Sequence, residues 1–171
     1  GFLLYFDKKN SNLTFYDGRE TAPSKIKKDF FLDNNGEPLE FYDIAVGGMA
    51  IGVPGLVSML ELAHKNHGLL EWKSLFKPAI KLAENGFKIS PRLHKAINKD
   101  KYLYFFPESK KLFYEKDKTY IKMTPKMEDR IQPKKTSTII KNLEFAETLK
   151  TISIKKSKGF YEGKIANRIV H

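Results

Sequence analysis

The sequence contains no cysteine, which excludes disulfide bonds and thiolate metal sites. It also has no apolar run near the roughly 20 residues that a membrane-spanning helix needs. The stretch "GGMAIGVPG" at residues 47–55 is rich in glycine but has neither the dinucleotide-binding nor the P-loop spacing, so we do not expect a nucleotide cradle. Its glycines are instead typical of a tight backbone turn and close packing of the helix that follows. No G-x-S-x-G sequence marks a nucleophile elbow.

Arginine is scarce in a chain that is otherwise strongly basic. Among 31 lysine and arginine residues there are four arginines, Arg19, Arg92, Arg130 and Arg168, and the formal net charge is +11. Lysines are spread along the chain without a long basic block, and arginine is the residue best suited to bidentate contacts with phosphates and bases. We therefore favour compositional drift in an AT-rich genome over nucleic-acid binding, an alternative that predicts a clustered positive face.

Apolar and aromatic side chains are plentiful, at 41% and 13% of the 171 residues, which suffices for one domain with a real core. The first residue is Gly1 rather than Met, and the chain opens directly on a predicted strand, so we expect sequence to be missing upstream. No internal repeat or low-complexity tract is present. Residues 1–171 are therefore predicted to be a single, incomplete segment without a domain boundary.

The first half of the chain predicts a hairpin followed by helices. The aromatic-rich runs "FLLYF" at 2–6 and "NLTFY" at 12–16 are joined by a polar turn, as in a β-hairpin. Residues 25–41 are broken by glycine and proline and are expected to form a loop. From Val53 the apolar spacing becomes helical and stops at Gly68.

A second helical pattern covers residues 72–83, where Pro78 should either divide the helix or kink it. Gly86 follows as a predicted C-cap, and Ser90-Pro91 predicts the N-cap and first position of a third helix. Asn142 is the predicted cap of a further amphipathic helix.

Residues 99–133 are the least regular part of the chain. Within them "YLYFF" fits either a strand or an aromatic anchor, and "ESKKLFYEKDKTYI" has weak hairpin character. A last short helix is expected over residues 160–170. The order of elements predicts an α+β fold, or part of one.

Few residues suggest chemistry by their spacing alone. His64 and His67 lie three residues apart on a predicted helix, but no third ligand accompanies them, so a metal site is not predicted. Six carboxylates form no recognisable acid–base pair and are expected to be solvated: Glu61, Glu71, Glu84, Asp29, Asp33 and Asp43.

Arg19, in "YDGRETAP" at residues 16–23, has two interpretations. It is either an ordinary surface arginine after a strand or a rigid guanidinium fork aimed at a carboxylate, a role that lysine fills poorly. In the second interpretation Asp17 or Glu20 could hold the fork in place. Physical reasoning on these residues alone favours the first interpretation.

Several ordered blocks nevertheless resemble the large subunit of the γ-glutamyltranspeptidase (glutathione hydrolase) family. The enzymes of this family are N-terminal nucleophile hydrolases. The blocks are "YDGRETAP", "GGMAIGVPGLVSMLELAHKNHGLLEWKSLFKPAIKLAENGF", "FPES", "NLEFAETLKTI" and "GFYEGKIANRIV". The similarity is collinear from Gly1 to about Val170. It is densest over residues 46–87 and thin over residues 116–138.

The resemblance implies a partial αββα sandwich and a parent enzyme that transfers γ-glutamyl groups, as from glutathione, to water or amino acids. Arg19 matches the family's arginine that binds the α-carboxylate of the γ-glutamyl group. The family's nucleophile is the N-terminal threonine of the small subunit, and neither Thr119 nor Thr148 lies in the family's cleavage context. The resemblance therefore places no catalytic residue in this chain.

The same resemblance implies further expectations about the parent protein. Its partner would be the small subunit of the same precursor, no cofactor or metal is implied, and its location would be periplasmic or extracellular. We expect the isolated chain to be inactive and marginally stable, because a hairpin edge and helix faces would stay uncovered. The alternative from another class is an inactive remnant or a helical binding module of a truncated gene.

Overall fold

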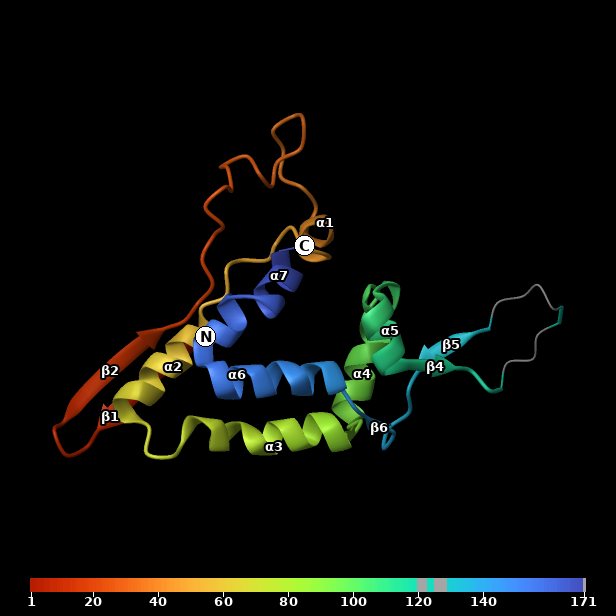
Figure 1. Ribbon diagram of the computed structural model, residues 1–171. Coiled ribbons are helices and arrows are strands. Elements are labelled where there is room, and N and C mark those ends of the chain that lie inside the picture. Colours follow the sequence, from red (N-terminus) through yellow and green to blue (C-terminus); the bar gives the residue numbers. More distant parts are fainter. Residues whose placement is uncertain (120–122, 125–128, 171) are drawn as a thin grey trace. The chain divides into compact units, whose positions relative to one another are not determined.

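The computed structural model describes residues 1–119, 123–124 and 129–170, and Figure 1 shows helices and short strands that are connected by loops. In chain order the elements are β1 (Phe2–Asp7), β2 (Asn12–Asp17), α1 (Phe41–Ala45), α2 (Leu56–His67), α3 (Trp72–Asn85), β3 (Phe87–Lys88), α4 (Pro91–Lys99), the 3-10 helix η1 (Leu103–Phe105), α5 (Pro107–Phe113), β4 (Tyr114–Lys116), β5 (Ile131–Pro133), β6 (Ile139–Ile140), α6 (Leu143–Tyr161) and α7 (Lys164–Val170). The predicted α+β class, with a hairpin followed by several helices, is confirmed.

The chain forms two compact units. The first comprises Gly1–Ser74 with Thr151–His171, and the second comprises Leu75–Lys150. Three antiparallel two-stranded sheets are present among the described residues, pairing β1 with β2, β3 with β6, and β4 with β5. The expectation of a single segment without a domain boundary stays a prediction.

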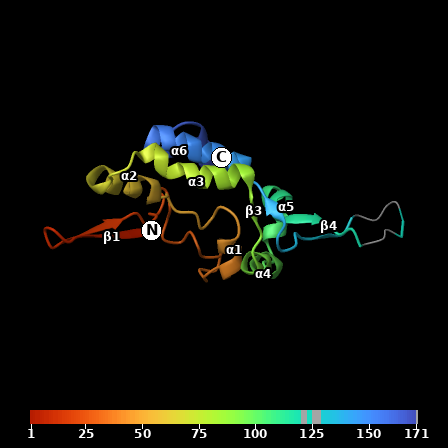
Figure 2. The ribbon, with the colours of Figure 1, turned by 90° about the horizontal axis from the view of Figure 1, so that it is seen from below.

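The first unit is built around the predicted hairpin, which is confirmed. β1 and β2 pair over their whole length, from Phe2 opposite Asp17 to Asp7 opposite Asn12. Figures 1 and 2 show this hairpin beside α2. Because successive strand residues point to opposite faces, one face carries the buried Tyr16 onto Met59 and Ala63 of α2, where a small core forms.

Three of the predicted helix ends are reproduced, although α2 begins at Leu56 rather than at Val53. Gly68 terminates α2, and its N–H donates to the carbonyl of His64 at 2.7 Å. The Ser90 hydroxyl accepts the N–H of Leu93 at 3.1 Å at the start of α4. Before α6 the side-chain oxygen of Asn142 accepts the N–H of Phe145 at 2.9 Å. These caps depend on neighbours within a few residues, which is why the sequence reveals them.

Two further predictions concern α3 and its end. Gly86 adopts φ +88°, a left-handed conformation in which side chains are strained, so the predicted glycine C-cap is confirmed. The division of the helix at Pro78 is wrong, since α3 runs through this residue as one helix. Trp72 and Ala83, both buried, lie on either side of the proline. Their burial outweighs the one backbone hydrogen bond that proline removes.

Other parts of the chain differ from the expectation. The strand alternative for "YLYFF" is wrong, because Leu103–Phe105 forms a 3-10 turn followed by α5. The weak hairpin predicted within residues 108–121 is wrong for the described part of that stretch, because residues 108–113 belong to α5 and β4 pairs instead with β5, farther along the chain. Residues 120 and 121 of the predicted hairpin lie outside the described residues. The last helix begins at Lys164 rather than at residue 160. Residue 156 interrupts α6 with φ 56° and ψ −143°.

The second unit has its own buried apolar residues. Ile89, Ile97, Ile140 and Ala146 are almost inaccessible to solvent, and the β3–β6 pair places Ile140 opposite Phe87. The N–H of Asn142 donates to the carbonyl of Ala83 at 2.9 Å, which ties the start of α6 to the end of α3 within this unit. The pairing of two-residue strands is thus supported by helix packing.

Candidate functional site

Arg19 lies two residues after the end of β2, in a segment whose backbone is fixed on both sides. The N–H of Gly18 donates to the carbonyl of Gly1 at 2.9 Å, which extends the hairpin by one residue. On the other side Thr21 and Val53 exchange two backbone hydrogen bonds, of 3.1 and 2.8 Å. The Arg19 backbone therefore has a defined place between the hairpin and the glycine-rich stretch.

The two carboxylates that could hold Arg19 play different parts. The carboxylate of Asp17 accepts the backbone N–H of Arg19 at 2.9 Å and so turns the chain after the strand. Glu20 contacts the guanidinium itself, with its Oε1 atom 3.5 Å from the Nε atom of Arg19. The arginine side chain is 67% exposed. An exposed guanidinium with one carboxylate neighbour is accessible to a ligand.

The hairpin that leads to Arg19 is fastened to the end of α2 by a polar cluster. The hydroxyl of the buried Tyr16 lies 2.7 Å from Nε2 of His67 and accepts the side-chain N–H of Asn66 at 3.0 Å. The ring of Tyr5 stacks on His67, with ring centres 3.7 Å apart. Sequence reasoning missed this role of His67, because its partners lie 50 or more residues away.

The two histidines of α2 have separate partners. Nε2 of His64 lies 2.8 Å from the carbonyl of Leu70, and its ring meets the Trp72 ring edge-on. Within the described ranges no group of three or more histidine, aspartate or glutamate side chains is placed to hold a metal ion. His64 and His67 thus have structural contacts at the C-terminal end of α2.

Two of the six carboxylates that were expected to be solvated are partly buried and make defined contacts. In the first unit Glu61 accepts the backbone N–H of Ser157 at 2.8 Å, just after the interruption in α6. Hydrogen bonding by Ser157 holds the pKa of Glu61 below its ordinary value of 4.5. In the second unit Glu84 lies 2.7 Å from Nζ of Lys150. Glu147 and then Glu84 raise the pKa of that lysine.

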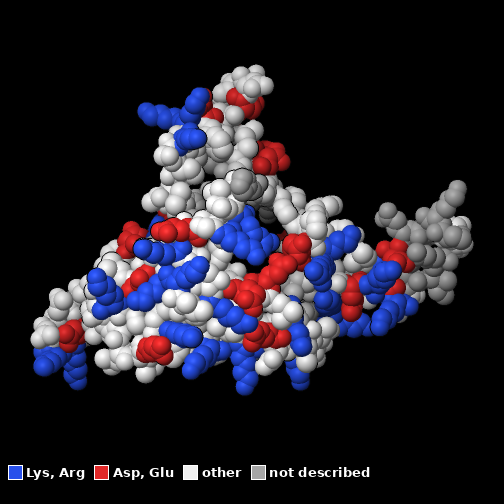
Figure 3. All heavy atoms as spheres, in the orientation of Figure 1, with Lys and Arg blue, Asp and Glu red and all other residues white. Residues whose placement is uncertain are grey.

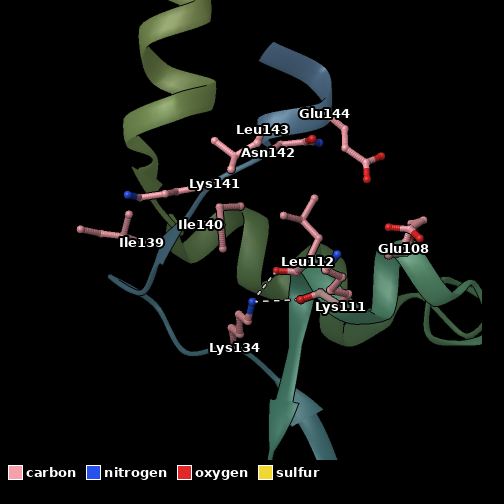
Figure 4. Close-up of a pocket in the computed structure, with 11 residues that line it drawn as sticks. Glu108, Lys111, Leu112, Lys134, Ile139, Ile140, Lys141, Asn142, Leu143 and Glu144 are labelled. Carbon is pink, nitrogen blue, oxygen red and sulfur yellow. Dashed lines mark hydrogen bonds between the residues drawn. The ribbon is translucent and has the colours of Figure 1, made fainter. Parts of the chain in front are cut away.

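A cavity of about 750 Å³ in the second unit offers both apolar and charged walls (Figure 4). Glu108 and Glu144 stand at one side of it. The Nζ atom of Lys134 donates to the carbonyls of Lys111 and Leu112, at 3.2 and 2.8 Å. Lys134 therefore satisfies carbonyls at the end of α5.

Two other cavities of the second unit differ in character. One, of about 470 Å³, is almost wholly apolar and includes Leu82, Phe87 and Phe145. The other, of about 400 Å³, is polar and includes Asp117 and Arg130, whose charged groups lie 3.9 Å apart. Arg19 lines none of the three cavities, so the sequence-predicted residue and these hollows are separate features.

The surface shows how the net charge is distributed. On the face in Figure 3, cationic and anionic side chains are interleaved. Among the helices that the structure describes, none combines the length and apolarity needed to cross a bilayer.

Comparison with known proteins shows where this chain belongs. The family model of gamma-glutamyltranspeptidase matches residues 1–171. The glutathione hydrolase proenzyme of Bacillus subtilis is 32% identical over 169 residues, which cover 99% of this chain and 26% of that protein. Glutathione hydrolase 3 of Arabidopsis thaliana is 33% identical over 170 residues, covering 99% and 24%. The chain thus spans about a quarter of the length of these relatives.

A solved structure gives the same result. The gamma-glutamyltranspeptidase of Helicobacter pylori superposes with a TM-score of 0.84 at 31% identity, over 99% of this chain and 44% of that one. Proteins of this family are enzymes that are processed into two subunits. By sequence over its whole length and by fold, the chain belongs to the gamma-glutamyltranspeptidase family.

Proposed function

We propose that this chain is part of the large subunit of a γ-glutamyltransferase or glutathione hydrolase, and that Arg19 binds the α-carboxylate of the γ-glutamyl substrate. The observation that carries the proposal is the place of Arg19. It lies two residues after a strand that is anchored by Tyr16, and its guanidinium is exposed beside Glu20. The family match over the whole chain supports this assignment.

The chemistry of the guanidinium fits this role. Its planar fork offers parallel N–H donors to the two oxygens of a carboxylate. The contact with Glu20 is made at Nε, so the donors on the two Nη atoms are the ones we assign to the substrate. The Asp17 turn fixes the backbone from which the side chain extends.

The bond-breaking step belongs to the partner in this proposal. The N-terminal threonine of the small subunit attacks the γ-carbonyl carbon, its hydroxyl proton passes by way of the free α-amine to the departing amine, and a glutamyl ester forms. Water or the amine of an amino acid then attacks that ester, which releases glutamate or a new γ-glutamyl amide and restores the threonine. Residues 1–171 alone are therefore expected to be inactive.

The outer face of the hairpin supports a polypeptide partner. Five apolar side chains at alternate positions, each about 60% exposed, share the face opposite the one on α2: Phe2, Leu4, Phe6, Leu13 and Phe15. A hairpin that is apolar on both faces is typical of a strand pair covered on both sides. We assign this outer face to contact with further parts of the same precursor, including the small subunit. We place that protein in the periplasm or outside the cell.

The test uses the full-length precursor after its processing, with a γ-glutamyl anilide as substrate. Arg19→Lys removes one of two parallel charge-assisted hydrogen bonds, worth about 1.5–3 kcal/mol, so KM should rise about 10- to 150-fold. Arg92→Lys, the same change at an exposed position of α4, is the matched control and should leave KM unchanged. Equal kinetics for both variants would refute the assignment of Arg19. A processed precursor without any activity would favour the inactive remnant.

A further inference from the structure

The segment that carries Arg19 passes unusually close to two glycines of the stretch 47–55. A Cβ atom on Gly55 would lie 2.9 Å from the carbonyl oxygen of Arg19 and 3.0 Å from that of Gly18. A Cβ atom on Gly52 would lie 2.9 Å from the Cγ atom of Glu20 and 3.0 Å from the carbonyl oxygen of Thr21. Real Cβ atoms essentially never come within 3.0 Å of such atoms. A side chain on Gly55 must therefore displace the backbone of the segment, whereas one on Gly52 must displace the Glu20 side chain and would press on the Thr21 carbonyl.

A second observation shows that the two segments are held together rather than merely adjacent. Between the two glycines, Val53 exchanges two backbone hydrogen bonds with Thr21. On the hairpin side a Cβ atom on Gly18 would lie 2.6 Å from the Cβ atom of Met59 in α2. The backbone on both sides of Arg19 is thus packed against α2 and the residues just before it.

We propose that Gly52 and Gly55 are positioning residues that set where the Arg19 guanidinium stands, an inference that rests on the proposed function of Arg19. Their lack of side chains lets the backbone at 52–55 approach the backbone at 18–21, so that the ladder bond to Thr21 can form. This contact holds the segment from the turn at Asp17 to Glu20, and with it Arg19, in a single conformation. The glycine-rich stretch is accordingly a support for a substrate-binding arginine.

The experiment compares Gly55→Ala with Gly48→Ala in the processed full-length protein. Gly48 is the matched control, because it lies in the same stretch, has no positive φ, and has no atom within 4 Å of the place that a Cβ atom would take. Two substrates are used, a γ-glutamyl anilide and the 4-aminobutyryl anilide, which lacks only the α-carboxylate. Displacement of Arg19 should raise KM for the first about tenfold in Gly55→Ala while kcat stays within about twofold.

The second substrate separates positioning from a general structural defect. For the 4-aminobutyryl anilide, Gly55→Ala should change nothing, since no carboxylate reaches Arg19. In an Arg19→Ala background, Gly55→Ala should likewise leave KM for the γ-glutamyl anilide unchanged. If Gly55→Ala prevents folding, Gly52→Ala replaces it, because its nearest obstacle is the flexible Glu20 side chain.

The outcomes distinguish this inference from the proposed function. If Arg19→Lys raises KM while the glycine variants do not, or if they impair both substrates equally, the positioning role is overturned and the function of Arg19 stands. If the glycine variants raise KM while Arg19→Lys has no effect, the function of Arg19 is refuted, and the inference that depends on it is refuted as well.

Discussion

Two strand pairs among the described residues, β1 with β2 and β4 with β5, differ in how they are held. The hairpin of β1 and β2 pairs six residues on each strand and buries Tyr16 against α2. That of β4 and β5 pairs three, and one of its six members is Pro133, which has no N–H to donate. In β1 and β2 the regular alternation of aromatic and apolar residues goes with pairing over six residues. In β4 and β5, where polar residues and a proline interrupt that alternation, the strands pair over three residues. The residue assigned to substrate follows the better-anchored hairpin.

The largest expected effect is the loss of stability when Tyr16, which anchors the first hairpin to α2, is replaced. Tyr16→Ala removes a buried aromatic ring and its hydrogen bonds to His67 and Asn66, and should lower the free energy of unfolding by about 3–5 kcal/mol. Tyr114→Ala, in the second hairpin, removes a half-buried ring and should cost about half as much. Denaturant unfolding of both variants measures the difference. Equal losses would contradict the view that the two hairpins are held differently.

A smaller effect is expected from the hydrogen bond that the Glu61 carboxylate accepts in the first unit. Glu61→Gln weakens the hydrogen bond to Ser157 and should lower the free energy of unfolding by about 1 kcal/mol at pH 7. The folded carboxyl has a pKa below the ordinary 4.5, so its contribution is complete above pH 4.5 and is lost as the pH falls through the folded value. Wild type and variant should thus converge in acid.

Thermal melts from about pH 7 to about pH 3 check this prediction, with Glu71→Gln, at an exposed position before α3, as the control. The control should follow the wild type at every pH. A gap between wild type and Glu61→Gln that stayed constant on acidification would show that the carboxylate charge has no part in holding Ser157.

The sequence predicted those features that depend on near neighbours. Ser90, Gly86 and Asn142 were identified as caps because each acts within its own turn. The short helices α1 and α5 were missed, since five and seven residues carry too little periodicity to recognise.

The rest depends on residues that meet only in the folded chain. His67 contacts Tyr16 across 51 positions, and Glu61 contacts Ser157 across 96, so no local pattern reveals either contact. Arg19 was singled out by its rarity and by resemblance to a family, while the residues that support it, Gly52 and Gly55, became apparent only from their distances to its backbone.

The central claim is that Arg19 binds the α-carboxylate of a γ-glutamyl donor. Its most direct test is the ratio of kcat/KM for the γ-glutamyl anilide to that for the 4-aminobutyryl anilide, measured in the wild-type processed protein and in Arg19→Ala. We predict a ratio of about 100 or more in the wild type, falling to near one in the variant, because only the substrate carboxylate pairs with the guanidinium. A ratio that is unchanged by the substitution would contradict the account.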